Sequence, residues 1–224
     1  TLNGREDIDG ILVQLPLPKH ISEKKIIHAI RPDKDVDAFH PYNVGRLLTG
    51  NYSFLPCTPA GVMEMLRAYE IPVEGKVCTV VGRSNIVGKP MAMMLLRANG
   101  TVISCHSRTP KLAEFTRQAD ILVTSAGVLN SLTADYVRPG QIVIDVSINW
   151  DPEKINAKGA KGFVPLRALI EVSDQCLFVL LLVGHSCLTC QSSTLRRLLR
   201  ILLEVEHRRR EITLTRIGED SDDD

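Results

Sequence analysis

Residues 78–90, with the sequence CTVVGRSNIVGKP, lead from an apolar, β-branched run through a short loop into a helix-like segment. Gly82 allows the backbone to turn sharply, and Gly88 allows the helix to approach the strand closely. The amino end of such a helix offers free N–H groups and the positive end of a dipole to a phosphate. The spacing G-x5-G only partly matches the G-x-G-x-x-G pattern of dinucleotide-binding turns. The segment nevertheless predicts a phosphate-binding βα turn.

Strand-like and helix-like runs alternate around this turn. Short, continuous apolar strands separated by helices are typical of a parallel sheet that is buried on both faces. We therefore predict an α/β protein with a Rossmann-type parallel sheet. The expected strands are Val77–Val81, Thr101–His106, Ile121–Thr124 and Ile142–Val146, and the expected helical segments are Pro90–Ala98, Lys111–Gln118 and Thr133–Val137.

Small or polar residues follow each expected strand. Parallel sheets bind their ligands at the carboxyl ends of the strands, and such residues are hard to explain there as core. This favours a dinucleotide site, with a flavodoxin-like or purely structural sheet as the alternative. The four strand ends carry Gly82-Arg83-Ser84, His106-Ser107-Arg108, Ser125-Ala126-Gly127 and Ser147-Ile148-Asn149.

The second strand end indicates which dinucleotide is bound. An NAD site usually has an acidic residue there for the ribose 2′-hydroxyl, whereas a 2′-phosphate requires positive charge and hydroxyl donors. This chain has Ser107 and Arg108 instead, with Arg83 in the preceding loop. We predict NADP rather than NAD. The alternative is that one or both arginines are solvated surface charges.

Composition excludes several classes of function. The 224 residues are 44% hydrophobic and 24% charged, which suits a globular protein of one large or two modest domains. A net charge of +1 argues against nucleic acid as the main partner. The longest apolar run, Cys176–Val183, falls far short of the ~20 residues that span a bilayer. We also expect no secretory or transit segment within these residues.

The six cysteines favour reduced thiols over a metal site. Cys78 and Cys105 lie in expected buried strands, where a free cysteine behaves as a small hydrophobe. His185, Cys187 and Cys190 have the spacing of metal ligands, but no second Cys-x-x-Cys pair accompanies them. We therefore expect no bound metal and a reducing, cytoplasm-like compartment.

The first fifty residues contain a second group of candidate binding residues. Asp9–Pro18 is predicted to be one buried strand broken by two prolines, in which the amide of Gln14 must find hydrogen bonds from the backbone or a ligand. A helix over Ser22–Ile30 follows, and then a loop, residues 33–41, that is dense in carboxylates and contains His40. Composition alone leaves a binding loop and a solvated charged turn equally open.

Several of these strings closely resemble the bifunctional methylenetetrahydrofolate dehydrogenase/methenyltetrahydrofolate cyclohydrolase family in its bacterial form. The resemblance runs almost without gaps from about Ile8 to about Asn149. It rests on DGILVQLPLPKHI, PDKDVDAFHPYNVGRLLTG, FLPCTPAGVMEML, VVGRSNIVGKP, CHSRT, RQADILV and VIDVSIN.

The resemblance implies part of a folate-binding domain in residues 1–56 and an NADP-binding domain in residues 57–150, with the active site in the cleft between them. It further implies a homodimer that acts in one-carbon metabolism and purine biosynthesis. Its members oxidise 5,10-methylenetetrahydrofolate with NADP and hydrolyse the methenyl product to 10-formyltetrahydrofolate. The expected partners are accordingly tetrahydrofolate derivatives.

The resemblance also assigns roles on the folate side. Val13, Gln14 and Leu15 are similar to the strand end that contacts folate, with Gln14 beside the one-carbon unit. Asp37 is similar to the carboxylate that accepts the pterin's N–H groups, which suits a side chain that only accepts hydrogen bonds.

On the cofactor side, Gly82, Arg83 and Ser84 are similar to the family's NADP loop. Ser107, with Arg108 beside it, matches the position near the 2′-phosphate. Ile148 matches the residue that packs on the nicotinamide.

The chain departs from the family's pattern in three respects. The family's catalytic lysine, in a Tyr-x-x-x-Lys pattern, would precede Thr1, and the family's Pro-Gly-Gly-Val-Gly-Pro loop is absent from the sequence. Alanine and serine stand at Ala38 and Ser147, where the family has glycine. We therefore expect these residues to support the hydrolytic step poorly. A catalytically inactive NADP-binding or interaction module is the alternative.

Residues 151–224 change in character, and nothing after about Ala157 resembles the family. An amphipathic helix is expected over 195–203, where leucines lie opposite arginines, with Ser193 or Thr194 as its cap. An acidic end, expected to be disordered, follows. This helix either covers exposed core or binds a partner or a membrane surface. An aberrant reading frame or an alternative splice end is also open.

Overall fold

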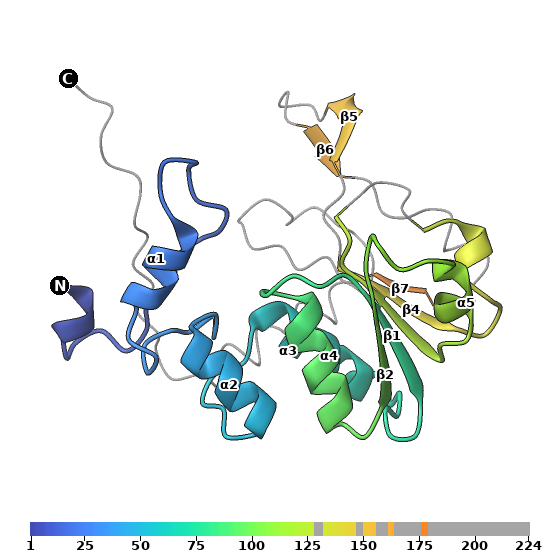
Figure 1. Ribbon diagram of the computed structural model, residues 1–224, viewed down its shortest axis with the longest axis horizontal. Helices are drawn as coiled ribbons and strands as arrows, with labels where there is room; N and C mark the ends of the chain where they lie inside the picture. Colours follow the sequence, from blue (N-terminus) through green and yellow to red (C-terminus); the bar gives the residue numbers. More distant parts are fainter. Residues whose placement is uncertain (128–131, 147–149, 156–160, 164–175, 179–224) are drawn as a thin grey trace. The chain divides into compact units, whose positions relative to one another are not determined.

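The computed structural model describes residues 1–127, 132–146, 150–155, 161–163 and 176–178 (Figure 1). The described residues fall into two compact units that divide between Cys57 and Thr58. Each unit is treated by itself below. The expected helix over 195–203 and the acidic end lie outside the described residues.

The second unit is built on a parallel sheet of five strands in the order β2-β1-β3-β4-β7. The pairing places Val81 beside both Cys105 and Thr124, and Thr124 beside Asp145, so the carboxyl ends of four strands meet at one edge. The strands are β1 (Val77–Val81), β2 (Thr101–Cys105), β3 (Ile121–Thr124), β4 (Ile142–Asp145) and β7 (Cys176–Phe178).

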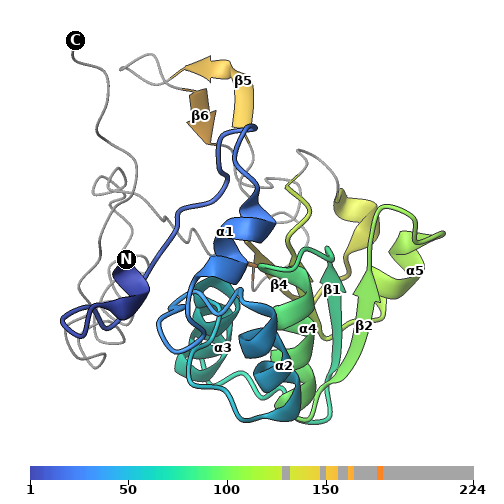
Figure 2. The same ribbon diagram turned by 60° about the vertical axis from the view of Figure 1, so that its left-hand side comes forward.

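Helices cover both faces of this sheet. Figures 1 and 2 show α3 (Cys57–Ala68) and α4 (Gly88–Arg97) on one face and α5 (Leu112–Arg117) on the other. Met91 and Leu95, one helical turn apart, turn the buried side of α4 towards the core. On the opposite face, Phe115 of α5 packs against a buried cluster that includes Leu122.

The structure confirms the α/β fold, and the expected strands at 77–81 and 121–124 have the observed bounds. The expected helix over 133–137 is a short 3-10 turn, η2 (Ala134–Tyr136). The prediction that every strand is buried on both faces is wrong for β2, in which Thr101 and Ser104 are exposed. β2 is more exposed because it is an edge strand of the sheet. The pattern of apolar residues along a strand does not reveal its place in the strand order.

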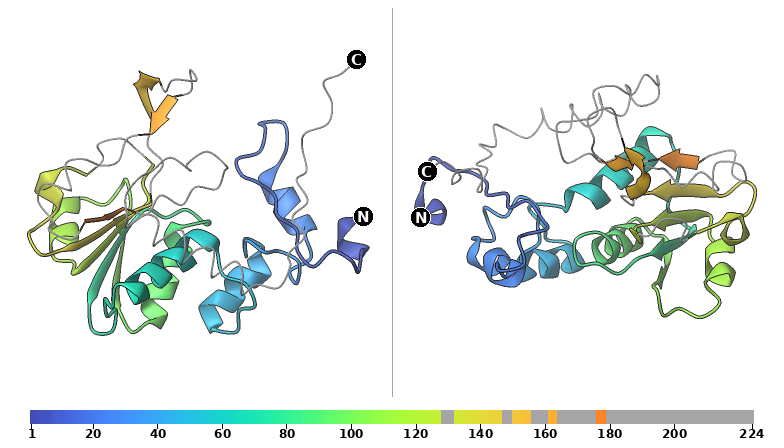
Figure 3. Two further views of the ribbon diagram at one scale, coloured as in Figure 1. Left: turned by 180° about the vertical axis from the view of Figure 1, so that it is seen from behind. Right: turned by 90° about the horizontal axis from the view of Figure 1, so that it is seen from above.

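A two-stranded antiparallel sheet follows β4 in the chain. It consists of β5 (Trp150–Ile155) and β6 (Lys161–Phe163) (Figure 3). The register of the pair shifts between Asp151 and Ile155. The sequence analysis did not predict this hairpin, because Pro152, Glu153 and Lys154 are poor strand formers.

In residues 1–57, the described part of the first unit, there are three short helical elements. They are η1 (Leu2–Gly4), α1 (Glu23–Ala29) and α2 (Pro41–Thr49). The side chain of Ser22 caps α1 by accepting a hydrogen bond from the Lys25 N–H, in agreement with the predicted helix. One cluster of this unit's core consists of Ile8, Ile11 and Ile30, with Leu2 and Val13 packed against it.

The prediction of a buried strand over Asp9–Pro18 is wrong. A single parallel bridge joins Ile11 to Asp35, and Gln14 is exposed. The two prolines are the physical cause, since neither Pro16 nor Pro18 can donate to a ladder of hydrogen bonds. Among the described residues, no helix is long and apolar enough to cross a membrane.

Candidate functional site

Gly82 forms the turn at the carboxyl end of β1 and has a φ of +134°, a conformation that other residues rarely adopt. A Cβ atom on Gly82 would lie 2.2 Å from the Oγ atom of Ser125, which follows β3. The strand order makes β1 and β3 the pair at which the chain reverses direction across the sheet. The sharp turn expected at Gly82 is therefore confirmed, and it lies at the position where such sheets bind ligands.

Gly88, the first residue of α4, is required by a different contact. A Cβ atom there would lie 2.2 Å from the carbonyl oxygen of Gly82 and 2.8 Å from the backbone nitrogen of Arg83. Both atoms belong to backbone and cannot rotate away. The expected close approach of the helix at Gly88 is thus confirmed, and its partner is the loop backbone itself.

Ser84 occupies the amino end of α4. Its Oγ atom accepts hydrogen bonds from the N–H groups of Val87 (3.1 Å) and Gly88 (3.2 Å), and its carbonyl oxygen accepts one from Lys89 (3.0 Å). The prediction of free N–H donors at this helix start is therefore wrong for these three groups. The exposed Ser84 hydroxyl still has its proton to donate, and it lies at the positive end of the helix.

The turn after β2 is held by its own side chains. The His106 N–H donates to Thr109 Oγ1 (2.9 Å), and the Arg108 N–H donates to His106 Nδ1 (3.1 Å). These bonds fix the backbone and leave the side chains of Ser107 and Arg108 exposed. A bond of 2.9 Å from the Gly82 N–H to the Cys105 carbonyl ties this end of β2 to the turn that carries Arg83.

The ends of β3 and β4 bring a hydroxyl and a carboxyl group to the same edge. Thr124 and Asp145 lie side by side in the register, and both are buried. Within the described part of the chain, the Thr124 Oγ1 atom has no hydrogen-bond partner. Ile148, the residue expected beside the nicotinamide, lies outside the described residues.

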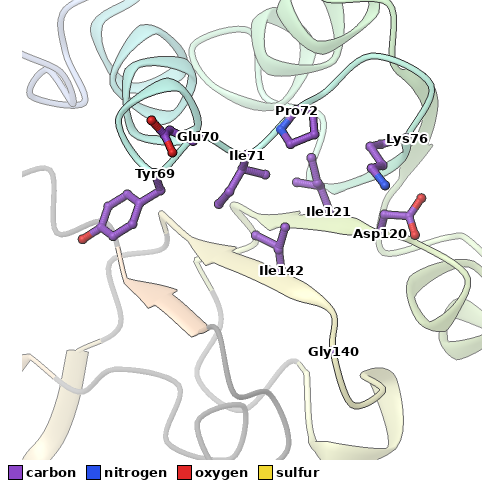
Figure 4. A pocket seen from close by; sticks show the side chains of 9 residues that line it. All are labelled: Tyr69, Glu70, Ile71, Pro72, Lys76, Asp120, Ile121, Gly140 and Ile142. Carbon is purple, nitrogen blue, oxygen red and sulfur yellow. The ribbon is translucent and has the colours of Figure 1, made fainter.

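A pocket of about 350 Å³ opens near the amino ends of the strands, opposite the carboxyl ends described above (Figure 4). Lys76 and Asp120 line it and immediately precede β1 and β3. The Asp120 carboxylate accepts hydrogen bonds from the Val77 N–H (3.0 Å) and from Arg138 Nη2 (3.2 Å), which secure the loops of that edge. The pocket therefore does not coincide with the strand ends that carry the candidate cofactor residues.

Three aspartates of the loop at residues 33–37 have three different surroundings. The exposed Asp33 forms an ion pair with Arg31 at 2.5 Å, and the hydrogen bond from that guanidinium lowers the pKa of Asp33. Asp35 is buried and accepts hydrogen bonds from the His40 N–H (2.8 Å) and from Asn43 Nδ2 (2.9 Å). Asp35 is therefore a structural carboxylate that organises the turn into α2.

Asp37 is the remaining carboxylate, and it is half-buried. It stands between Val36 and Ala38, both of which are buried, and Ala38 has a φ of +56°. The Asp37 Oδ1 atom lies 3.9 Å from the Sγ atom of Cys57, within reach of an S–H···O hydrogen bond. From the sequence, only the family resemblance distinguishes Asp37 from the other two aspartates.

The other candidate folate residues lie around Gln14. Its exposed amide donates a hydrogen bond of 2.9 Å to the carbonyl oxygen of its neighbour Leu15. Val13 and Leu15 are half-buried, and Val13 packs on the core of the first unit. Among the described residues, no group of three or more histidine, cysteine or acidic side chains could hold a metal ion. His185, Cys187 and Cys190 lie outside the described residues.

A parallel sheet with a glycine-built turn at its reversal point defines the second unit as a Rossmann-type nucleotide-binding fold. Residues 56–174 match the family described as "Tetrahydrofolate dehydrogenase/cyclohydrolase, NAD(P)-binding domain", and residues 1–37 match the catalytic domain of the same family. The chain belongs to the tetrahydrofolate dehydrogenase/cyclohydrolase family.

Curated relatives carry the name bifunctional protein FolD. The protein from Acetivibrio thermocellus is 60% identical over 148 residues, which make up 66% of this chain and 52% of the relative. The protein from Burkholderia lata is 61% identical over 150 residues, or 67% of this chain and 52% of the relative. The chain thus spans about half the length of the curated relatives that it matches.

Solved structures give the same result. The FolD dehydrogenase/cyclohydrolase from Campylobacter jejuni is 47% identical with a TM-score of 0.71, over 80% of this chain and 62% of that one. The enzyme from Trypanosoma brucei, solved with NADP and an inhibitor, is 34% identical with a TM-score of 0.71, over the same shares.

Proposed function

We propose that the second unit binds NADP at the carboxyl edge of its sheet. The observation that carries this is the juxtaposition of the Gly82 turn with the fixed turn after β2. The residues fit the group: Ser107 and Arg108 are exposed donors where an NAD site has an acidic side chain, and Arg83 follows Gly82 in the adjoining loop. Ser84 adds a hydroxyl donor at the start of α4. Ile148 is proposed to contact the nicotinamide.

We propose that the whole protein oxidises 5,10-methylenetetrahydrofolate to the 5,10-methenyl form and hydrolyses this to 10-formyltetrahydrofolate. NADP, held by Ser84, Ser107 and Arg108, would supply the acceptor for the hydride that leaves the methylene carbon. Asp37 is proposed to accept the N–H groups of the pterin, and Gln14 to lie beside the one-carbon unit, flanked by Val13 and Leu15. Membership in the family and the half-buried carboxylate of Asp37 support this assignment.

The cofactor proposal predicts a preference that calorimetry can measure. NADP should bind more tightly than NAD, and Arg108→Ala should weaken NADP by about 10- to 100-fold while changing NAD little, because a charge-assisted contact to phosphate contributes about 1.5–3 kcal/mol. Arg117→Ala removes an equal charge from the exposed last turn of α5 and serves as the control. Equal affinities for the two dinucleotides would refute the proposal.

The reaction is tested with purified residues 1–224. NADP-dependent formation of the methenyl absorbance would support the enzyme, whereas its subsequent loss is expected to be slow in these residues. Tight NADP binding without any NADP-dependent formation of the methenyl absorbance would instead favour a binding or interaction module.

We further propose a homodimer in a reducing, cytoplasm-like compartment. The family resemblance supports the dimer. The compartment is supported by the free thiols of Cys57, Cys78 and Cys105, which are the cysteines whose state the structure describes. Sedimentation of the purified protein tests the dimer, and microscopy of the tagged protein tests the location.

A further inference from the structure

Cys57 makes a contact that neither the cofactor site nor the core of the sheet explains. It is the first residue of α3, it is exposed, and its Sγ atom lies 3.9 Å from the Asp37 Oδ1 atom. Both residues belong to the first unit. A thiol is a weak hydrogen-bond donor, and an ionised carboxylate can only accept. Cys57 is therefore the donor of this hydrogen bond, and Asp37 is the acceptor.

The backbone around Asp37 is already fixed. Val36 is 5% exposed and Ala38 is 1% exposed, and Ala38 is held in the left-handed region. Asp35, two residues earlier, is anchored by the His40 N–H and by Asn43. The main chain of Asp37 is thus flanked by buried neighbours, and the orientation of the carboxylate depends on rotation of its side chain. A donor next to one carboxylate oxygen acts directly on that rotation.

We propose that Cys57 is a positioning residue for Asp37. Its thiol favours the rotamer in which the carboxylate faces a ligand that presents a planar pair of N–H donors, as the amino-pyrimidinone edge of a pterin does. This inference rests on the proposed folate-binding function of Asp37. Because the donor is weak, the effect on ligand affinity is modest, about two- to fivefold.

A double-mutant cycle tests the proposal with tetrahydrofolate as the probe, titrated by calorimetry into the 224-residue chain under reducing conditions. Asp37→Asn should weaken binding markedly. Cys57→Ala should weaken it by about two- to fivefold without changing the melting temperature or the affinity for NADP. Cys57→Ser, which retains a donor, should restore most of the loss. The cycle is closed with Asp37→Ala, which removes the acceptor oxygen altogether, and in that background Cys57→Ala should have no further effect.

A second measurement reports the contact without any ligand. A neighbouring carboxylate disfavours the thiolate, so Asp37→Asn should accelerate alkylation of Cys57 by iodoacetamide at neutral pH by about two- to fivefold, as followed by peptide mass spectrometry. Asp33→Asn is the matched control, because it removes the same charge from the same loop at a carboxylate paired with Arg31. Equal alkylation rates in the two variants would overturn the contact.

The outcomes separate the two proposals. If Asp37→Asn weakens tetrahydrofolate binding and Cys57→Ala does not, Asp37 keeps its role and the positioning role of Cys57 is wrong. If Asp37→Asn leaves the affinity unchanged, or if the wild-type chain does not bind tetrahydrofolate, the folate assignment of Asp37 fails and the inference fails with it. A loss in Cys57→Ala that Cys57→Ser does not restore would indicate packing rather than hydrogen bonding.

Discussion

Thr79 and Thr124 are chemically identical and equally buried, yet their hydroxyl groups differ in what they contribute to stability. Thr79 Oγ1 donates a hydrogen bond of 2.9 Å to the carbonyl oxygen of Phe115, whereas Thr124 Oγ1 has no partner within the described residues. A buried hydroxyl without a partner costs free energy, because it has lost its hydrogen bonds to water.

Replacing each threonine by valine, which has nearly the same shape, should therefore give changes of opposite sign. Thr124→Val should raise the free energy of unfolding by about 1 kcal/mol, because it removes an unsatisfied group. Thr79→Val should lower it by about 1–3 kcal/mol, because it removes the hydrogen bond to the Phe115 carbonyl. Urea denaturation of both variants measures the changes. If both variants lose a similar amount of stability, the Thr124 hydroxyl does have a hydrogen-bond partner and this prediction is wrong.

Single residues were predictable where sterics alone decide the outcome. Gly82 and Gly88 were assigned correctly because only glycine has room for a sharp turn or a touching backbone. Ser84 was placed in the loop, but its hydrogen bonds to the N–H groups of Val87 and Gly88 were missed, because a loop serine can equally face solvent or the backbone that follows it. Its spacing of three and four residues from those two N–H groups is a signal that could have revealed the bonds.

At the scale of elements, the amino end of α4 and the middle of α2 differ in the space that they leave for a side chain. A Cβ atom on Gly88 would meet the Gly82 carbonyl oxygen at 2.2 Å, whereas one on Gly45 would meet nothing within 4 Å. Both glycines lie within helices, so alanine improves the intrinsic helix propensity at either position.

We expect the two alanine substitutions to separate propensity from packing. Gly45→Ala should stabilise the chain by up to about 1 kcal/mol. Gly88→Ala should destabilise it by about 3 kcal/mol or more, because backbone must move, and NADP binding should be lost with the displaced loop. Thermal unfolding and dinucleotide titration measure both. A neutral Gly88→Ala would show that the loop can shift without cost.

β1 and β3 were predicted correctly because they are short, continuous apolar runs that are rich in β-branched residues and bounded by polar ones. Such runs are too short for a buried helix and fit a strand buried on both faces. The segment over 9–18 is just as apolar, but its prolines remove the N–H groups that a strand needs. β2 was located correctly, but its exposure depends on strand order, which is decided by contacts far apart in the chain.

At the scale of the whole molecule, the three free cysteines among the described residues differ in their exposure to solvent. Cys57 of the first unit is exposed, whereas Cys78 and Cys105 are buried in the sheet of the second. Burial, with a smaller contribution from the Asp120 charge, raises the pKa of the Cys78 thiol to about 11. In the unfolded chain the same thiol ionises near its ordinary pKa of about 9.

This difference makes the stability of the second unit depend on pH in the alkaline range. Below pH 9 the thiol is protonated in both states and has no effect. Between pH 9 and 11 the unfolded state loses its proton first, so the free energy of unfolding should fall by roughly 1.4 kcal/mol per pH unit from this group.

Comparing the wild type with Cys78→Ala at pH 8 and pH 10.5 isolates this contribution from those of other titrating groups. The gap in stability between the two proteins should narrow as the pH rises. A gap that stays constant would show that Cys78 ionises equally easily in the folded state.

The hydrogen bonds that Ser84 makes at the start of α4 have a consequence for the kinetics of cofactor binding. Ser84 already satisfies the N–H groups of Val87 and Gly88, so the loop does not depend on an incoming phosphate to complete its hydrogen bonds. The conformational entropy of ordering this segment is therefore lost when the protein folds, not when the dinucleotide arrives. A rapid-mixing experiment should accordingly record a single bimolecular phase whose rate rises linearly with dinucleotide concentration, with no slower isomerisation after it.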